Sequence, residues 1–513
     1  MNFPKDPPLP DQPTQLLEVS HLPRPNATGG ATRVGRGGFI GATIAKLPKV
    51  AKVTAIAVTF ALLATGSLFA GVAVGSTREA PAVEPSAVAP SQPATLSPTA
   101  TPSPTAAATR PVPPGVAAIH LRTCSLAAFA ADANLPGFQA SVLNIATNEV
   151  LFDRNSATAA RTSGVLKALT AAAALSALGP DHRISTRVVA GSTPGTVVLI
   201  GGGDPTLSAL GAGAESVYRG APKLSDLAAQ VKAKSAVPIT DLVLDSTLWD
   251  QNDNWDPSWD SAELGAGIQS KITALSVDGG RANPALQVSP RSANPVADAG
   301  AAFAADLGIP ASGHITVGPA PASALPLGEV KSQPVSALIA YLLTAGDNTL
   351  AEHLARLSSK LAGGNGSAAS LAQVIPAVIT RFGLNAAGVS IRDGSGLSTS
   401  NAVPAAFIAQ FMAKVSARTQ GLDIVYDALS IAGKTGTLAS RFLGSNAVAR
   451  GAVNAVTGAG ATEYSIAGVI HAADGTAVSF AFYALGAVNS RSIPALDAIT
   501  RAVFSCGNNL SNN

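Results

Sequence analysis

The sequence predicts an α/β fold in which strands from both ends of one domain flank a group of helices, with a strand-rich segment inserted between them. Three observations lead to this prediction. A hairpin pattern near residues 140–152 precedes a helical stretch, a second hairpin pattern lies near 465–484, and apolar runs typical of strands occupy the middle. We therefore expect an α/β core built from both ends of the domain.

Each expected element follows from a local signal. Turn residues separate the strands of a hairpin, Gly-Pro stops a helix, and Asp-Gly is typical of a tight hairpin turn. In chain order we expect strands at 140–145 and 149–152 around Thr147 and Asn148, a helix at 163–178 ended by Gly179 and Pro180, strands within 195–208 and 241–249, helices near 335–361 and 402–417, and a final hairpin of 465–472 and 477–484 around Asp474 and Gly475.

A transmembrane anchor is predicted near the N-terminus. Residues 53–75 are 23 consecutive residues without a charge, which is about 34 Å of helix and enough to cross a hydrocarbon core of about 30 Å. Lys46, Lys49 and Lys52 precede this stretch and only Arg78 follows soon after, so the positive-inside rule places the tail in the cytoplasm and the remainder outside. A signal peptide is the alternative, but the stretch is too long and too far from Met1.

The flanks of the anchor differ in composition. Residues 1–52 are rich in Pro and Gly without periodicity and are expected to be disordered, whereas residues 76–115 hold ten prolines and are expected to form an extended spacer. The globular body then begins at about residue 116.

Charge argues against a nucleic-acid partner. Of the net charge of +3, residues 1–52 account for seven Lys or Arg against three Asp or Glu, so the rest of the chain carries a net charge of −1. The main body therefore has no net basic field to hold a polyanion. With 47% hydrophobic and 13% charged residues, the chain is also not of the charge-driven disordered class.

The two cysteines, Cys124 and Cys506, lie at opposite ends of the body. Outside the cytoplasm they can form a disulfide, which we favour because the termini of one domain commonly lie close together. Two buried free thiols are the alternative.

Five ordered segments resemble the class C low-molecular-mass penicillin-binding proteins, which are D-alanyl-D-alanine carboxypeptidases and endopeptidases of peptidoglycan. The resemblance implies a penicillin-binding/β-lactamase-like transpeptidase fold, an antiparallel sheet with helices on both faces, formed by residues 116–190 and 331–510, with 191–330 inserted. The segments are GGGDPTLS at 201–208, LVLDSTLW at 242–249, ITALSVDGGRANP at 272–284, GDNTLAEHLAR at 346–356 and DGSGLSTSNAVP at 393–404.

Catalysis in this family implies three motifs, S-x-x-K, S-x-N and K-T-G. In place of the first motif, Gly164 stands three residues before Lys167, and Ser163 stands four before it. Ser163 shares the helical face of Lys167, but one residue of offset rotates a side chain by about 100°. Ser163 is interpreted as a helix N-cap, with a displaced nucleophile as the alternative.

The second and third motifs also depart from the family pattern. Gly346, Asp347 and Asn348 stand where Ser-Asp-Asn is expected, so the hydroxyl is missing. A literal K-T-G begins at Lys434, but the residues after it resemble a G-T-L-x-x-R-F element that precedes the true motif. The strand leading into the last hairpin instead carries Val456, Thr457 and Gly458, so the cation is replaced by an apolar side chain.

The three departures predict a homologue with impaired or lost catalysis that binds a peptidoglycan stem peptide or a cell-wall protein. The alternative is an active carboxypeptidase with Ser163 as nucleophile, Lys167 as base and Lys434 as cation, and a third possibility is a scaffold that binds no ligand. Asp393 and Ser395 lie in an intact D-G-S-G segment, interpreted as a structural turn rather than a substitute nucleophile. The scattered histidines suggest no metal, and Gly201–Gly203 lack the spacing of a dinucleotide site, so no cofactor is expected.

Overall fold

The computed structural model describes residues 121–310 and 312–512. The expected cytoplasmic tail, the anchor at 53–75 and the linker at 76–115 lie outside the described residues. Among the described residues, no helix is both long and apolar enough to cross a membrane.

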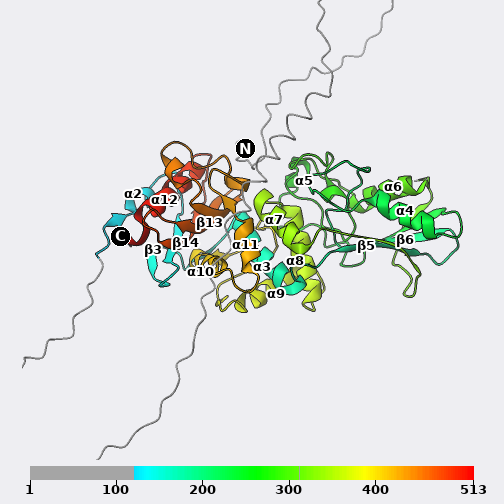
Figure 1. The fold of residues 1–513 in the computed structure, drawn as a ribbon, viewed down its shortest axis with the longest axis horizontal. Coiled ribbons are helices and arrows are strands. Elements are labelled where there is room, and N and C mark those ends of the chain that lie inside the picture. The colour runs from blue at the N-terminus through cyan, green and yellow to red at the C-terminus, as the bar shows by residue number, and fades with distance from the viewer. Residues whose placement is uncertain (1–120, 311, 513) are drawn as a thin grey trace, which may run out of the picture. The chain divides into compact units, whose positions relative to one another are not determined.

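A six-stranded antiparallel sheet joins the two ends of the described chain (Figure 1). Strand β14 pairs with β2, so the last hairpin lies directly beside the first. This arrangement, with helices packed on the sheet, confirms the predicted α/β fold. In spatial order the strands are β11 (Ser430–Ile431), β12 (Val453–Ala459), β13 (Glu463–His471), β14 (Ala477–Leu485), β2 (Gln139–Asn144) and β3 (Val150–Arg154).

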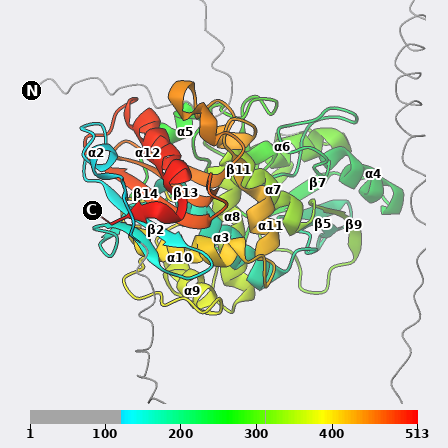
Figure 2. The ribbon, with the colours of Figure 1, turned by 60° about the vertical axis from the view of Figure 1, so that its left-hand side comes forward.

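Helices cover both faces of this sheet, because apolar side chains alternate along its strands and form a separate core on each side. Figure 2 shows α12 lying across β13 and β14, with α10 on the other side. One face carries α2 (Ala127–Ala130) and α12 (Ser492–Cys506); the other carries α3 (Lys167–Leu178) and α10 (Ala405–Ser416), backed by α7 (Val335–Ala345), α8 (Asn348–Leu361), α9 (Ala368–Thr380) and α11 (Leu422–Ala428).

The helix expected at 163–178 begins differently from the prediction. Residues Ser163–Leu166 form a 3-10 turn, η1, and the α-helix α3 starts only at Lys167. Thr162 occupies the N-cap position of η1, without a side-chain capping bond, and Ser163 has a left-handed backbone with φ of 45°. The expected N-cap role of Ser163 is therefore wrong, since a capping residue has an extended backbone and its side chain accepts a bond from the first turn.

The helix expected near 335–361 is two helices. Gly346, with φ of 70°, ends α7 in the left-handed conformation that glycine adopts without strain. Asp347 then begins α8 as its N-cap, and its side chain accepts a hydrogen bond from Leu350 N at 2.9 Å. The break between α7 and α8 thus has a stop signal at Gly346 and a start signal at Asp347, the next residue.

The inserted part of the chain forms a second sheet, which lies toward the opposite end of the described domain from α12 (Figure 1). Strands β6, β7 and β8 run parallel, while β5 is antiparallel to both β6 and β9. The inserted segment, predicted to be rich in strands, therefore also contains helices. These helices connect the parallel strands, because parallel pairing requires a crossover connection. Its elements are β5 (Ser185–Ala190), β6 (Thr196–Ile200), α4 (Leu224–Lys234), β7 (Asp241–Asp245), α5 (Ala262–Ala266), η2 (Asp278–Gly280), α6 (Pro295–Leu307), β8 (Ile315–Val317) and β9 (Pro326–Lys331).

The two ends of the described domain are tied together. A disulfide joins Cys124 to Cys506, whose Cα atoms are 5.6 Å apart. Beside it, β1 (Cys124–Ser125) pairs in parallel with β15 (Leu510–Ser511). The remaining short elements are β4 (Ala159–Ala160), which pairs with β10 (Val403–Pro404), and the 3-10 turns η3 (Gly436–Leu438), η4 (Gly444–Ala449) and η5 (Gly507–Asn509).

Candidate active site

Lys167 is the most buried charged group at the place of the first motif. Its side chain enters the core from the first position of α3, the residue is 4% exposed, and its Nζ donates a hydrogen bond to Ser395 O at 2.9 Å. Burial lowers the pKa of Lys167 to about 8, against the opposing effect of the negative charges of Asp393, Asp347 and Glu352. The amine is thus held in the manner of a catalytic base.

The residue beside this amine is Gly164. A Cβ built on Gly164 lies 3.2 Å from Lys167 Nζ, so a side chain at this position would touch the amine. Ser163 lies one residue earlier, in the left-handed backbone of η1, and its hydroxyl forms no hydrogen bond with the described residues. A residue without a side chain therefore stands beside the Lys167 amine, three positions before Lys167 in the sequence.

The end of β12 fills the space that a serine side chain would need. The Cβ built on Gly164 lies 2.6 Å from Thr457 O, and one built on Gly458 lies 2.5 Å from Gly164 N and 2.7 Å from Thr162 O. Real Cβ atoms do not approach backbone this closely. Ser465 Oγ also donates a hydrogen bond to Thr162 O at 2.6 Å, which fastens β13 to the same turn. Backbone meets backbone here, with no space for a hydroxymethyl group.

A third glycine closes the other side of the turn. Gly396, with φ of 89°, follows Ser395, and a Cβ built on it would lie 1.9 Å from Ser163 O. Any side chain at Gly396 would therefore displace η1. The D-G-S-G segment and β12 enclose the start of α3 between them.

The D-G-S-G segment itself is a buried, hydrogen-bonded loop. Asp393 and Ser395 are both fully buried, and the carboxylate of Asp393 accepts hydrogen bonds from Gly396 N, Asn401 Nδ2 and Trp259 Nε1 at 2.7–2.9 Å. The Ser395 hydroxyl accepts a bond from Leu397 N at 3.4 Å. Its burial removes it from any solvent-facing role as a nucleophile.

Glu352 of α8 stabilises this loop through hydrogen bonds. The sequence analysis did not identify it as a site residue. One of its carboxylate oxygens, Oε1, accepts hydrogen bonds from Gly394 N at 2.9 Å and Ser395 N at 2.6 Å, and the residue is 1% exposed. Burial raises the pKa of Glu352, and the neighbouring charge of Asp393 raises it further. The available signal was its place in the GDNTLAEHLAR segment, but nothing in the sequence distinguishes a buried glutamate from an exposed one.

The second motif is held by the insertion. The Asp347 carboxylate accepts a hydrogen bond from Arg281 Nη2 at 2.7 Å, and both side chains are at most 1% exposed. Burial alone would raise the pKa of Asp347, but the charges of Arg281 and Arg291 hold it at about 2. Asn348 Nδ2 donates to Ile268 O at 3.1 Å, so this amide also faces the insertion. Gly346 supplies no hydroxyl.

The two K-T-G candidates lie at opposite ends of β12. Val456 is 3% exposed and belongs to the apolar core around α3, while Thr457 and Gly458 follow it toward η1. Lys434 is exposed and its Nζ lies against Gly451, 2.8 Å from a Cβ built there, just before β12 begins. Val453 and Val456 are about 10 Å apart along the extended strand, and Gly451 precedes Val453, so the Lys434 amine at Gly451 lies away from the position of Val456.

An acidic side chain from the insertion lies near the amine. Glu263 of α5 has a buried Oε2 without a hydrogen-bond partner among the described residues. Burial and the negative charges of Asp260 and Asp393 together raise its pKa to about 7, against the opposing charges of Lys167 and Arg161. Acidic side chains therefore lie near the Lys167 amine. No pattern in the sequence indicates that Glu263 is one of them.

In chemical terms, the described residues hold an amine of lowered pKa beside Gly164, which has no side chain. Within the described residues, no group of three His, Cys, Asp or Glu side chains is placed to hold a metal ion. The arrangement can accept and donate hydrogen bonds. The side chains at positions 164, 346 and 456, which are Gly, Gly and Val, carry no nucleophile, no hydroxyl and no cationic group.

The sheet, the buried Lys167 at the head of α3 and the inserted domain define the penicillin-binding class of serine-peptidase folds. A profile of the D-Ala-D-Ala carboxypeptidase 3 (S13) family matches residues 123–289 and 282–503. The chain therefore belongs to this family, and the class C penicillin-binding relationship predicted from the sequence is confirmed.

Individual relatives cover nearly the same span. The chain is 31% identical to carboxypeptidase DacB of Mycolicibacterium smegmatis over 462 residues, 89% of this chain and 96% of that protein. It is 34% identical to a carboxypeptidase of Mycobacterium tuberculosis over 395 residues, 75% of this chain and 84% of that protein. Penicillin binding protein 4 of Haemophilus influenzae shares the fold, with a TM-score of 0.62 at 19% identity over 72% of this chain and 97% of that one.

Proposed function

We propose that this protein is a membrane-anchored, extracytoplasmic member of its family that has lost acyl transfer and acts by binding a peptidoglycan stem peptide or a cell-wall protein. The observation that carries the proposal is the contact between Gly164 and the backbone of Thr457 and Gly458. Losses within a catalytic unit are not rescued by its remaining members, so Lys167 without its serine supports no acyl-enzyme route.

Labelling with a fluorescent penicillin tests the loss of chemistry. The full-length protein is expected to form no covalent adduct that survives denaturation, whereas a catalytically active member of the family, treated in parallel, is labelled. An adduct that resists hydrolysis in this chain would overturn the proposal.

Binding is tested with a stem peptide ending in D-Ala-D-Ala. Thr457 lies in β12 with its carbonyl oxygen against Gly164, Asn348 is the first residue of α8, and both are polar groups at the third and second motif positions. We expect measurable binding in a calorimetric titration and at least a tenfold loss of affinity in Asn348→Ala. A pure scaffold would bind no peptide, and this result would replace the first proposal.

An active serine carboxypeptidase is the second candidate. The lowered pKa of Lys167 and the left-handed backbone of Ser163 favour it, since such features gather at catalytic sites. It requires D-alanine release from a pentapeptide and loss of that release in Ser163→Ala. Lys434 lies near Gly451 and would not serve as its cation.

The anchoring part of the proposal rests on residues 53–75 and their flanking lysines. Fusions of a reporter that is active only outside the cytoplasm should give signal when placed after residue 115 and none after residue 50. Release of the protein from membranes by salt alone would contradict an integral anchor.

A further inference from the structure

The segment between β11 and β12 carries two exposed apolar side chains. Leu443, which precedes η4, is 64% exposed, and Val448 within η4 is 62% exposed. Figure 2 shows this segment in orange beside α12, against which η4 packs. Single exposed apolar residues are common on protein surfaces, but two large ones within six residues indicate a contact surface. Residues 443–450, together with Lys434, are called the η4 surface below.

A strained backbone at Phe442 sets the course of this segment. The Phe442 ring is fully buried, yet its φ is 58°, a left-handed conformation that a bulky residue seldom adopts. The carboxylate of Asp497 on α12 accepts hydrogen bonds from Phe442 N at 3.2 Å and from Arg441 Nη2 at 2.7 Å. Such strain persists only where surrounding contacts impose it. Phe442 thus fixes the segment to the core, while Leu443, the next residue, is left in solvent.

The charges of this segment are all positive. Residues 428–462 include Lys434, Arg441 and Arg450 but no Asp or Glu. Arg441 is neutralised by its ion pair with α12, whereas Lys434 and Arg450 are exposed and form no ion pair with the described residues. A Cβ built on Gly451 would lie 2.8 Å from Lys434 Nζ, so the Lys434 amine lies beside the residue that follows Arg450. The two cations are therefore neighbours.

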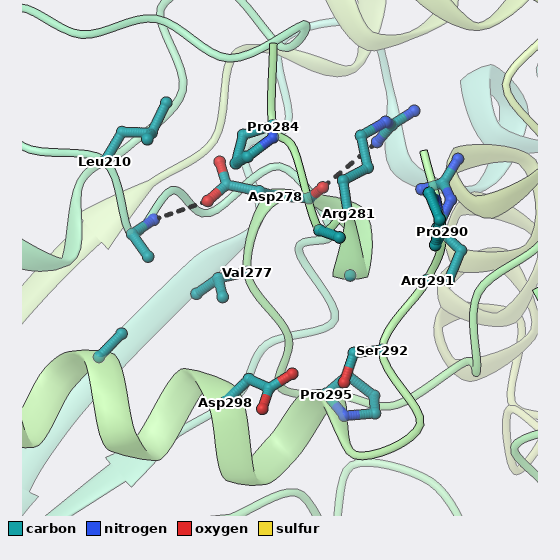
Figure 3. Close-up of a pocket in the computed structure, with 14 residues that line it drawn as sticks. Leu210, Val277, Asp278, Arg281, Pro284, Pro290, Arg291, Ser292, Pro295 and Asp298 are labelled. Carbon is teal, nitrogen blue, oxygen red and sulfur yellow. Dashed lines mark hydrogen bonds between the residues drawn. The ribbon is translucent and has the colours of Figure 1, made fainter. Parts of the chain in front are cut away.

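These cations differ from the arginines of the inserted part of the chain. Figure 3 shows Arg281 and Arg291 at a cavity of about 400 Å³, and both residues are buried. Arg281 donates a hydrogen bond to Asp347 at 2.7 Å, and Arg291 donates one to Gly279 O at 2.7 Å. The charges of these two arginines stabilise the fold. Those of the η4 surface are accessible to a partner outside it.

The η4 surface lies near the point where the N-terminal part of the chain joins the body. Asp497, which holds the segment, and Cys506 are nine residues apart on α12, or about 14 Å of helix. Cys506 is bonded to Cys124, three residues after the first described residue. The η4 surface also precedes β12, whereas Thr457 lies near the other end of that strand. A partner bound at η4 would therefore leave the motif positions uncovered.

We propose that the η4 surface binds a membrane surface that contains anionic phospholipids. Leu443 and Val448 enter the headgroup region, where aliphatic side chains are favoured, and Lys434 and Arg450 pair with lipid phosphates. Two aliphatic and two basic side chains bind weakly by themselves, but an anchored chain keeps them close to the bilayer at high effective concentration. The inference rests on the anchor included in the proposed function and is independent of the loss of catalysis.

A fluorescent probe at position 448 tests this contact. The full-length Val448→Cys protein is labelled with NBD at its one free thiol and reconstituted into vesicles of phosphatidylcholine alone or of equal parts phosphatidylcholine and phosphatidylglycerol. We expect at least twofold higher NBD emission in the anionic vesicles, with quenching by nitroxide-headgroup lipid. Val317→Cys, at a position that is 60% exposed on β8, is the control and should emit equally in both. Equal emission from the probe at 448 would overturn the proposal.

Charge substitutions assign the effect to the two cations. In the labelled protein, the double variant Lys434→Gln, Arg450→Gln should lower emission in anionic vesicles to the level in phosphatidylcholine. The double variant Lys232→Gln, Lys234→Gln removes the same charge from exposed positions on α4 and should leave emission unchanged. Equal responses of the two double variants would overturn the assignment. Thermal unfolding verifies that each is folded.

Two further measurements separate the possible failures. Emission that responds to polyglutamate and not to anionic vesicles would assign the surface to an acidic protein and overturn the lipid proposal. High salt is added after the emission has been recorded. Protein that then leaves the vesicles contradicts the anchor, whereas protein that stays confirms it. The emission recorded before extraction decides the η4 surface in both cases, so the two proposals fail independently.

Discussion

Gly164 stands three residues before Lys167, and its lack of a side chain allows β12 to contact the start of α3. Gly396 and Gly458 likewise allow close packing around the start of α3. A Cβ built on either one would lie 1.9–2.7 Å from backbone atoms of residues 162–164. A single serine restored at this place would therefore meet a surface that has adapted to its absence.

Gly164→Ser is expected to restore no acylation and to destabilise the fold. Its Cβ would lie 2.6 Å from Thr457 O, so β12 must shift, at a cost of about 1–3 kcal/mol for overpacking. Urea unfolding measures the loss, and fluorescent penicillin measures acylation. Gly164→Ala, which adds the same Cβ without a hydroxyl, is the control and should lose a similar amount; a stable, labelled serine variant would contradict the expectation.

Lys167 should make stability depend on pH in alkaline solution. Its pKa is lowered from 10.5 to about 8 in the folded protein, so between these values the unfolded chain binds more protons and stability rises with pH. Relative to Lys167→Met, the wild type should gain about 1.4 kcal/mol per pH unit over this window, or about 3 kcal/mol in all. Chemical unfolding of both proteins at pH 7, 8.5 and 9.5 gives this difference, and a constant difference would show that Lys167 keeps its ordinary pKa.

At the scale of elements, the junction between α8 and the insertion rests on one buried ion pair. Asp347 is both the N-cap of α8 and the partner of Arg281, which follows η2. Tyr218 adds its hydroxyl at 3.1 Å from Asp347 Oδ2, and its ring lies 4.8 Å from the Arg281 guanidinium carbon. The start of α8 is therefore positioned by residues of the insertion.

Arg281→Met is expected to cost about 3–5 kcal/mol, because it leaves the carboxylate of Asp347 buried without its cation. Asp347→Asn keeps an acceptor for Leu350 N and so isolates the loss of charge from the loss of the cap. The double variant should be more stable than the sum of the single effects predicts, as measured by thermal unfolding. Additive effects would mean that the pair is not coupled.

Local signals allowed much of the fold to be predicted from the sequence, and long-range contacts account for the rest. Asp474 and Gly475 indicate their hairpin directly, since β13 and β14 are adjacent in the chain. The parallel pairing of β6 with β7 could not be predicted, because an apolar run carries no information on strand direction. The resemblance located Gly164 and Val456, but the contact of Gly164 with Thr457 joins segments remote in the sequence and is seen only in the structure.

At the scale of the whole molecule, one covalent link encloses nearly all of the described domain. The disulfide closes a loop of 382 residues between Cys124 and Cys506. In the chain-entropy model, a loop of this length restricts the unfolded state by up to about 6 kcal/mol. The strand segment β15 lies just beyond this loop, and its parallel pairing with β1 holds the last described residues beside the disulfide.

Removing the disulfide is therefore expected to lower the unfolding free energy by several kcal/mol. The Cys124→Ala, Cys506→Ala double variant should unfold at lower denaturant concentration than the wild type, with an unchanged fold by circular dichroism. Reduction of the wild type by dithiothreitol should shift its midpoint to that of the variant. Equal midpoints for oxidised wild type and variant would mean that the link adds nothing to stability.

The pairing of β2 with β14 also sets the order of events during synthesis. The hairpin of β2 and β3 leaves the ribosome early, but its neighbour in the sheet and the helix α12 that covers that sheet are made last. Until then, the strand of residues Gln139–Asn144, every one of which is buried in the finished fold, has no sheet partner on one edge, and the face that α12 covers is open. An unpaired apolar edge is open to pairing with other chains, so we expect the nascent chain to be prone to association at this edge until β14 has been made.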